Sequence, residues 1–393
     1  MRGRRDSHGE SGGPGVSLVR PSVLAIAAGA AAVLPGFLVG ALVLQIRADL
    51  DVSVGAVAAG VTVFFAAGAL GAGPGGRMSE RTGALRAIRG CLVTTALCLG
   101  AAAASPSLAV LLALLAVAGV SNAITQPAIN LFMADQVPLR RQGLAFGIKQ
   151  SAIPAAVLVS GLALPLVALP FGWRPTFVLC GLGALAVAAG VGRSAARFVP
   201  PQARERPPRP SRALVVTAVG AALGSAGPNS LGAYLVASAV DIGIAEGTAG
   251  LLAALGSASS LAVRVGLGQV ADRRADYGFA MVVALLAAGS GGFALLASDA
   301  TAAFVAGTVV AFAIGWGWPG LFNLAVVDHN RHAPGAATGV TQTGIYIGAA
   351  GGPAAYGLLS TEIGYSAAWA VAGGCCLLGA LAFAYAGHLR TRG

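Results

Sequence analysis

Long apolar runs separated by short polar segments dominate this chain. Each run reaches the roughly 20 residues that a helix needs to cross about 30 Å of hydrocarbon. Backbone polar groups in lipid must be satisfied within their own segment, so each run is expected to be a transmembrane helix. The twelve runs cover residues 21–45, 53–76, 87–104, 108–132, 142–168, 173–192, 213–238, 247–270, 278–297, 301–327, 335–360 and 364–387. The pattern predicts an all-α membrane protein with twelve transmembrane helices.

One local pattern occurs twice, 192 residues apart. The two copies are Gly76-x-x-x-Glu80-Arg81 and Gly268-x-x-x-Asp272-Arg273. Further pairs at the same offset are Gly40 and Gly232, Pro127 and Pro319, Gly143 and Gly335, Gly147 and Gly339, Gln150 and Gln342, and Gly172 and Gly364. Two copies of one module in the same orientation are typical of a transporter, and they predict two pseudo-symmetric six-helix bundles.

Polar segments divide the chain into its expected parts. Residues 1–20 are rich in glycine and arginine and are expected to be a disordered cytoplasmic N-terminus. Residues 21–192 form the N-terminal six-helix bundle, and residues 213–388 form the C-terminal one. Between them, residues 193–212 are rich in proline and arginine, which favours a cytoplasmic linker. Residues 389–393 are a cytoplasmic tail.

Composition and charge placement both point to the membrane. Of the 393 residues, 56% are hydrophobic and 10% are charged, too little charge to cover a soluble surface. The net charge of +11 would by itself suit nucleic-acid binding. However, arginines gather in the terminal segments and in every second connection, whereas Arg47 and Arg174 alone fall in the others. This positive-inside distribution predicts a multi-pass plasma-membrane protein with both termini in the cytoplasm and no nucleic-acid partner.

The sequence lacks the residue patterns typical of an enzyme active site or a metal site. The five cysteines all fall in apolar runs without metal-ligand spacing, so they are expected to be packing residues. The four histidines lie in polar ends or loops. The pattern shows neither a paired nucleophile and base nor a phosphate loop, and the loops are too short for a catalytic domain. We therefore expect no enzymatic activity, no metal and no cofactor.

The segment after the second run reads Gly76-Arg-Met-Ser-Glu80-Arg81-Thr-Gly83-Ala-Leu-Arg86. It resembles the signature loop of the major facilitator superfamily, with Glu80 in place of the usual aspartate. The stretch from Gly268 to Asp272 and Arg273 resembles the weaker second copy of that loop. Together with twelve helices and a basic linker, the resemblance covers residues 20–388. It implies a bacterial, twelve-helix secondary transporter that works by alternating access.

The two signature segments are candidates for gating. Charge pairs or helix-end contacts, where two helices meet the cytosol, can favour one gate position. The gating candidates are Gly76, Glu80, Arg81, Gly83, Arg86, Gly268, Asp272 and Arg273. Alternatively, the arginines only mark the cytoplasmic side, although that role would not require the glycines.

Lys149 is the only lysine in the chain, and it lies inside the fifth run. With the run starting near Gln142, Lys149 is expected about 10 Å deep at 1.5 Å per residue. Burying a charge there costs at least about 2.5 kcal/mol, so an intramembrane cation is a functional candidate. Gln150 adds an amide beside it. The alternative is that Lys149 extends to the cytosol or pairs with Asp135.

Arg264 is the second intramembrane cation, in the eighth run. It precedes Asp272 by eight residues, which places it about 12 Å from the cytoplasmic end. One cation thus comes from each half at similar depth, and a guanidinium suits a carboxylate. A cation in the eighth helix also resembles organic-anion carriers of the superfamily. The alternative is an ion pair with Asp328 or Asp272.

Polar and aromatic residues on four other runs are candidates for the walls of a substrate cavity. They are Asn122 and Gln126 in the fourth run, Asn229 and Tyr234 in the seventh, Trp316 and Trp318 in the tenth, and Gln342 and Tyr346 in the eleventh. In this superfamily the first, fourth, seventh and tenth helices usually line the cavity. For each residue, a hydrogen bond between helices is an equally good explanation.

The sequence favours a secondary transporter for a small organic anion held by Lys149 and Arg264. The expected partners are this small-molecule substrate, a proton as the candidate coupling ion, and the lipid bilayer, with the protein a monomer. An exporter of hydrophobic neutral or cationic compounds is the first alternative. It is disfavoured because no acidic residue lies in mid-membrane. A membrane receptor that transports nothing is the second alternative.

Overall fold

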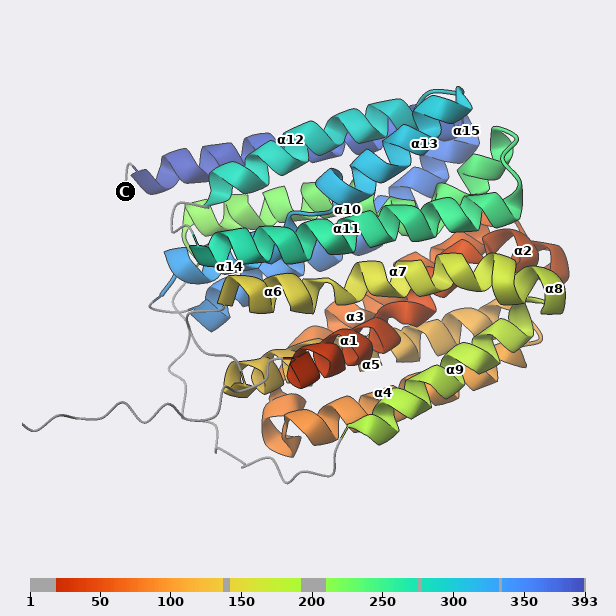
Figure 1. The fold of residues 1–393 in the computed structure, drawn as a ribbon, viewed down its shortest axis with the longest axis horizontal. Helices are drawn as coiled ribbons and strands as arrows, with labels where there is room; N and C mark the ends of the chain where they lie inside the picture. Colours follow the sequence, from red (N-terminus) through yellow and green to blue (C-terminus); the bar gives the residue numbers. More distant parts are fainter. Residues whose placement is uncertain (1–18, 137–141, 192–209, 274–277, 332–333, 392–393) are drawn as a thin grey trace, which may run out of the picture.

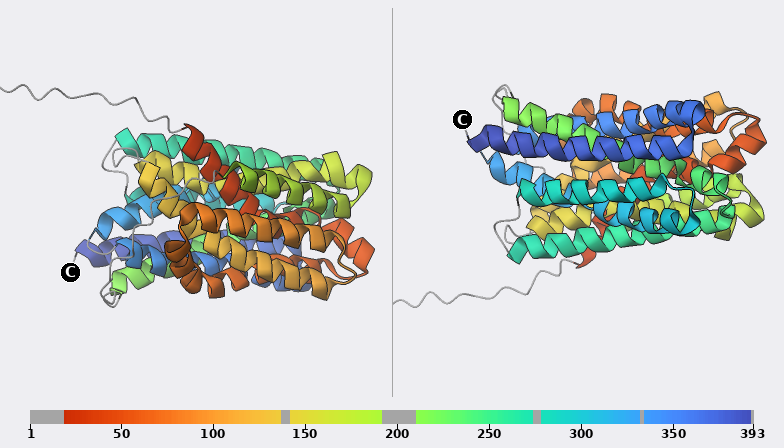
Figure 2. Two further views of the ribbon diagram at one scale, coloured as in Figure 1. Left: turned by 90° about the horizontal axis from the view of Figure 1, so that it is seen from below. Right: turned by 90° about the horizontal axis from the view of Figure 1, so that it is seen from above.

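The computed structural model describes residues 19–136, 142–191, 210–273, 278–331 and 334–391. The described part is a bundle of long helices that run between two opposite ends (Figures 1 and 2). One end carries Arg81, Arg273, Arg331 and Arg390, and we refer to it as the basic end. The other end carries Arg47 and Arg174.

The first half of the chain makes six crossings of the bundle. They are α1 (Val19–Ala41) with α2 (Val43–Leu50), then α3 (Val54–Thr82), α4 (Ala84–Ala103) and α5 (Leu108–Gln136), a fifth crossing made of α6 (Gln142–Gln150), α7 (Ala152–Ala163), the π-helix η2 (Leu164–Ala168) and α8 (Leu169–Phe171), and finally α9 (Trp173–Gly190).

The second half makes six more crossings. They are α10 (Arg212–Asp241), α11 (Glu246–Arg273), α12 (Phe279–Leu296), a fourth made of α13 (Thr301–Val310), the π-helix η3 (Ala311–Gly315) and α14 (Pro319–His329), and the last two joined in α15 (Pro334–Thr391). Within α15, Gly364 has a non-helical backbone (φ 83°, ψ 167°), so two helices meet there.

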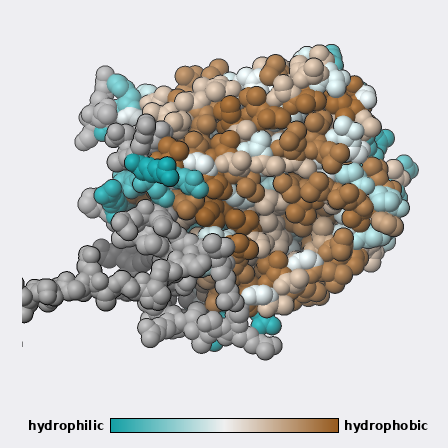
Figure 3. Space-filling model, viewed as in Figure 1, coloured by the Kyte–Doolittle hydropathy of each residue, from teal (hydrophilic) through white to brown (hydrophobic). Residues whose placement is uncertain are grey.

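Among the described residues, eleven helical stretches are long and apolar enough to cross a membrane. The last one spans 56 residues and contains the break at Gly364, so it accounts for two crossings. Twelve crossings match the twelve apolar runs, and the all-α fold expected from the sequence is confirmed. Hydrophobic residues cover the middle of the visible face, and hydrophilic ones lie toward its two ends (Figure 3), as lipid contact requires.

The backbone repeats at the offset found in the sequence. Gly172 before α9 has φ 93° and ψ 165°, and Gly364, 192 residues later, has φ 83° and ψ 167°. At the same offset, Asp51 and Gly243 have positive φ angles of 51° and 88°. Residues other than glycine rarely adopt positive φ angles. The matching turns therefore mark equivalent corners of the two six-helix bundles.

Two crossings are less regular than the sequence pattern predicts. The fifth was expected as one helix over 142–168, but it is interrupted at Ser151, between α6 and α7. Pro154 lacks the N–H that would continue the helical hydrogen-bond ladder there. The tenth was expected as one helix over 301–327, but it is interrupted at 316–318, immediately before Pro319.

The signature segments are also more helical than expected. α3 continues to Thr82 and α11 continues to Arg273. Gly76, Glu80 and Arg81 therefore lie in the last turns of a helix, and Gly83, with φ 86°, makes the turn into α4.

The two halves meet along a seam of glycines between α6–α7 and α11. A Cβ added to Gly161 would lie 2.6 Å from the Gly250 carbonyl oxygen, and one added to Gly250 would lie 2.7 Å from the Gly161 carbonyl oxygen. Gly143 and Gly268 make the same reciprocal contact, at 2.8 and 2.7 Å. The two contacts are 18 residues apart on each helix, about 27 Å at 1.5 Å per residue, nearly the hydrocarbon thickness.

Candidate functional site

Lys149 and Arg264 lie on the two helices of the glycine seam. A Cβ added to Gly147 would lie 2.6 Å from the carbonyl oxygen of Arg264, so the two backbones touch close to both cations. Lys149 is half-buried, and Arg264 is 1% exposed. The structure therefore puts one cation from each half at the same level of the contact between the halves.

The guanidinium of Arg264 is held by backbone oxygens. Its Nε and Nη2 atoms donate to the carbonyl oxygen of Trp316 at 3.0 and 2.6 Å. Its Nη1 atom donates to the carbonyl oxygen of Gln150 in α6. The guanidinium carbon also lies 5.7 Å from the centre of a Trp316 ring, within the range of a cation–π contact. Arg264 thus joins α11 to the first half and to the tenth crossing at once.

Helix breaks explain why these two carbonyls are available. In a continuous helix the Gln150 oxygen would accept from the N–H of residue 154, which is a proline and has none. Trp316 lies in the interruption between η3 and α14, outside both helical hydrogen-bond ladders. Arg264 supplies the donors that these breaks remove, which offsets the cost of a buried unpaired carbonyl.

The acidic partners considered for the two cations are engaged elsewhere or not described. Asp272 accepts hydrogen bonds from the backbone N–H groups of Gly143 at 2.7 Å and Leu144 at 3.1 Å. Asp328 pairs with Arg331 at 3.5 Å. The side chain of Asp135, the candidate partner of Lys149, lies outside the described part. Within the described residues, Lys149 makes no hydrogen bond or ion pair.

Asp272, one of the gating candidates, connects the end of α11 to the opposite half. Its two hydrogen bonds satisfy N–H groups in the first turn of α6, which have no partner inside the helix. A carboxylate at this position also complements the positive end of the helix dipole. Gly268, one turn earlier, allows the close approach to Gly143. This end of α11 therefore acts as a cap for the fifth crossing.

The other gating candidates have fewer described contacts. Arg81, Arg86 and Arg273 are exposed at the basic end. The side chain of Glu80 and the surroundings of Gly76 lie outside the described part, so the expected contact of Glu80 with the second half stays a prediction.

Several polar candidates on other crossings are buried and already bonded. The Gln126 side-chain amide donates to Asn122 Oδ1 at 3.1 Å, and the Asn229 amide donates to the Ser225 carbonyl at 2.8 Å. Tyr346 is 6% exposed, and Gln342 is half-buried.

The aromatic candidates separate into two groups. Trp316 contacts Phe37 of α1 at 5.8 Å between ring centroids, which links the halves beside Arg264. Trp318 instead packs against Phe322 and Phe383 in the core of the second half, at 5.2 and 5.9 Å. Tyr234 stacks on Tyr356 at 4.8 Å, also within the second half. The structure therefore groups Trp316 with Arg264 and places Trp318 and Tyr234 in the packing of the second half.

Phe37 was missed in the sequence. Its ring lies where a side chain at Gly232 would be, and it contacts Phe65 of α3 at 5.7 Å as well as Trp316. Gly40 and Gly232 are a repeat pair, and Gly40 also packs against Gly232. Phe37 precedes Gly40 by one helical turn, which is the signal that could have placed it at the contact.

Two similar membrane-spanning bundles that meet along a glycine seam, with a buried arginine at the contact, are the architecture of a membrane transporter. A family model described as Major Facilitator Superfamily matches residues 24–353. That match covers well over half of the chain, which therefore belongs to the major facilitator superfamily and is a secondary transporter for small molecules. A comparison with curated proteins found no match.

Proposed function

We propose that this transporter carries a small organic anion by alternating access, with Lys149 and Arg264 as the cations that hold it. The observation that supports this proposal is Lys149, the only lysine in the chain, which is half-buried and lies two residues from Gly147, where α6 packs against the backbone of the buried Arg264. A charge kept at that depth without an acidic partner among the described residues is expensive. An anionic substrate would compensate it.

Arg264 has donors to spare for such a substrate. It uses three of its five N–H groups on backbone oxygens. One N–H on each terminal nitrogen is left, and this pair matches the two oxygens of a carboxylate. We place Gln150, Trp316, Asn122, Gln126, Gln342 and Tyr346 around the same route as polar or aromatic wall residues.

The contact of Arg264 with Gln150 also offers a mechanism. This bond crosses between the halves, whereas the bonds to Trp316 stay within the second half. When the halves separate at this level, Arg264 loses one acceptor and gains a free N–H. An anion that takes over this donor stabilises the separated state, as alternating access requires.

Orientation follows from charge. We propose that the basic end faces the cytoplasm of the cell and that both termini lie there, because cytoplasmic loops carry an excess of arginine and lysine. Residues 21–192 and 213–388 are then the two moving bundles, joined by the cytoplasmic linker 193–212. Asp272 and its counterpart Glu80 are the proposed latches at this face.

One observation favours the exporter of hydrophobic compounds as a second candidate. The bonds of Arg264 go to backbone carbonyls, which is the pattern of a structural group. In that case the aromatic contact of Phe37 with Trp316 would form part of the binding surface. Charged and neutral ligands would then respond alike to loss of the cations.

Ligand binding by the purified full-length protein distinguishes the two candidates. A thermal-shift screen against organic acids, neutral compounds and organic cations identifies binders, because a ligand of the native state stabilises it. We expect carboxylates to bind, and Lys149→Gln to weaken them about 10- to 100-fold, as when a hydrogen-bonded charge partner is lost. Arg47→Gln, an exposed arginine at the opposite end, is the matched control. Equal losses for carboxylates and neutral binders would transfer the assignment to the exporter.

A further inference from the structure

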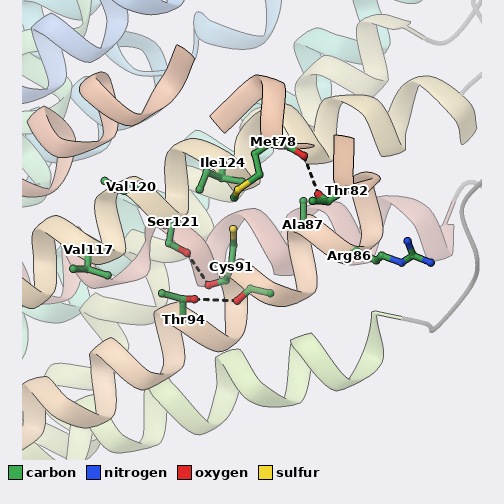
Figure 4. A pocket seen from close by; sticks show the side chains of 11 residues that line it. Met78, Thr82, Arg86, Ala87, Cys91, Thr94, Val117, Val120, Ser121 and Ile124 are labelled. Carbon is green, nitrogen blue, oxygen red and sulfur yellow. Dashed lines mark hydrogen bonds between the residues drawn. The ribbon is translucent and has the colours of Figure 1, made fainter. Parts of the chain in front are cut away.

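A groove on the first half lies away from the contact between the halves. It opens between α3, α4 and α5, with a volume of about 610 Å³. Met78, Cys91, Val117 and Ile124 contribute its walls (Figure 4). α4 packs against α5 and α9 of its own half. Because Met78 is 42% exposed and Val117 is 50% exposed, the groove faces the surroundings of the bundle, which are lipid in a membrane.

The hydroxyl groups in the groove already donate to backbone carbonyls. The Thr82 hydroxyl donates to the Met78 carbonyl at 2.9 Å, and the Thr94 hydroxyl donates to the Gly90 carbonyl at 3.2 Å. The Ser121 hydroxyl donates to the Cys91 carbonyl at 2.7 Å. The hydroxyl donors on these walls are therefore engaged, and a hydrocarbon chain would need none. The groove is therefore suited to an acyl chain.

The end of the groove has the opposite character. Arg86 belongs to the lining and extends toward the basic end (Figure 4). It lies in the first turn of α4, which begins at Ala84 and has no side-chain cap. Arg81 is exposed just before this turn, and neither arginine has an ion-pair partner within the described residues. Two cations without an ion-pair partner in the described part of the chain, at an uncapped helix start, favour an anion there.

We propose that the α3–α4–α5 groove binds an anionic phospholipid. One acyl chain occupies the apolar groove, and the headgroup phosphate sits at Arg86, Arg81 and the first turn of α4. Charge complementarity selects the lipid, since a zwitterionic headgroup would not neutralise the arginines. The lipid would rest on the turn at Gly83, which joins the signature segment in α3 to α4, and would stabilise that corner.

Two glycines provide a matched pair of positions for a test: one lines the groove and the other lies outside it. Gly90 lines the groove, and a Cβ added there meets no neighbouring atom within 4 Å. Gly183 on α9 is equally open and lies outside the lining. Gly90→Trp should therefore fold and occupy the groove, while Gly183→Trp places the same side chain elsewhere on the lipid-facing surface.

Native mass spectrometry of the full-length protein tests the proposal. The protein is released from mixed micelles of phosphatidylglycerol and phosphatidylcholine with identical acyl chains. We expect selective retention of one phosphatidylglycerol, reduced about fivefold by Arg86→Gln, as for loss of one arginine near an anionic headgroup. Gly90→Trp should remove this lipid, whereas Gly183→Trp and Arg47→Gln should retain it. Equal retention of both lipids, or equal loss in Gly90→Trp and Gly183→Trp, would refute the site.

Discussion

At the scale of single residues, Arg264 shows how a charge is kept inside an apolar bundle without an acid. Its donors reach Gln150 and Trp316, whose carbonyls are freed where two helices are interrupted. Pro154, which removes the helical donor to the Gln150 carbonyl, and Arg264, which replaces that donor, are therefore parts of one arrangement. Removing the arginine leaves the two buried carbonyls unpaired, at about 1–3 kcal/mol each.

This arrangement predicts a coupling between Arg264 and Pro154. Arg264→Met removes the donors from two carbonyls and should lower the free energy of unfolding by about 2–6 kcal/mol, or about 1–3 kcal/mol for each carbonyl. Pro154→Ala returns an N–H to the Gln150 carbonyl, so Arg264→Met should cost less in that background. The measurement is a double-mutant cycle from thermal or denaturant unfolding in detergent. Pro127→Ala, a proline inside α5, is the control background, in which the cost of Arg264→Met should stay at its full value.

The sequence could show which residues were unusual but could not show their partners. Lys149 and Arg264 stand out as ionisable groups in apolar runs, and their common level follows from counting residues along each helix. The bonds of Arg264 depend on which helix face turns toward the breaks at Pro154 and Trp316. That relation is set by three-dimensional packing and leaves no periodic signal in the chain. Phe37 was missed for the same reason, since an apolar residue in an apolar run is not distinctive.

At the scale of elements, glycines determine how closely the halves approach. The seam between α6–α7 and α11 brings backbone against backbone at both ends, through Gly143 with Gly268 and Gly161 with Gly250. Small residues at such crossings are usual in membrane helices, where close van der Waals packing drives association. The offset of 192 residues was readable from Gly143 and Gly268, each of which has a counterpart in the other half, but not from Gly161 or Gly250. Their pairing across the seam was not, because the repeat relates equivalent positions rather than contacting ones.

A larger side chain in this seam should disturb the contact between the halves. In Gly161→Val, a Cβ would lie 2.6 Å from the Gly250 carbonyl oxygen and 2.9 Å from the Ala254 nitrogen. Overpacking of this kind costs about 1–3 kcal/mol or moves the helices apart. We expect a lower melting temperature and reduced transport in proteoliposomes. Gly183→Val, where the added Cβ meets nothing within 4 Å, should behave as the unmodified protein. If Gly161→Val kept the melting temperature and transport rate of the unmodified protein, the close contact of Gly161 with Gly250 would not be required.

At the scale of the whole molecule, the distribution of charge distinguishes the two ends of a symmetric fold. The matching turns at Gly172 and Gly364, and at Asp51 and Gly243, show that the halves share one plan. These turns do not show which end of the protein faces the cytoplasm. Each half crosses the membrane an even number of times, so both halves have the same orientation whichever end is inside. The arginines break this ambiguity. They are concentrated at the basic end, and the opposite end has an ion pair between Arg174 and Asp49 at 2.8 Å.

The positive-inside rule therefore predicts which end of the protein is cytoplasmic, and cysteine labelling of cells can test it. Arg47→Cys places an exposed thiol at the opposite end, and Arg331→Cys places one at the basic end. The native cysteines lie within membrane-spanning helices, where a charged, membrane-impermeant maleimide has poor access. In intact cells we expect labelling of Arg47→Cys and not of Arg331→Cys, with both labelled after permeabilisation. The unmodified protein measures the background, and the reverse pattern would invert the proposed orientation and move the Asp272 latch to the outer face.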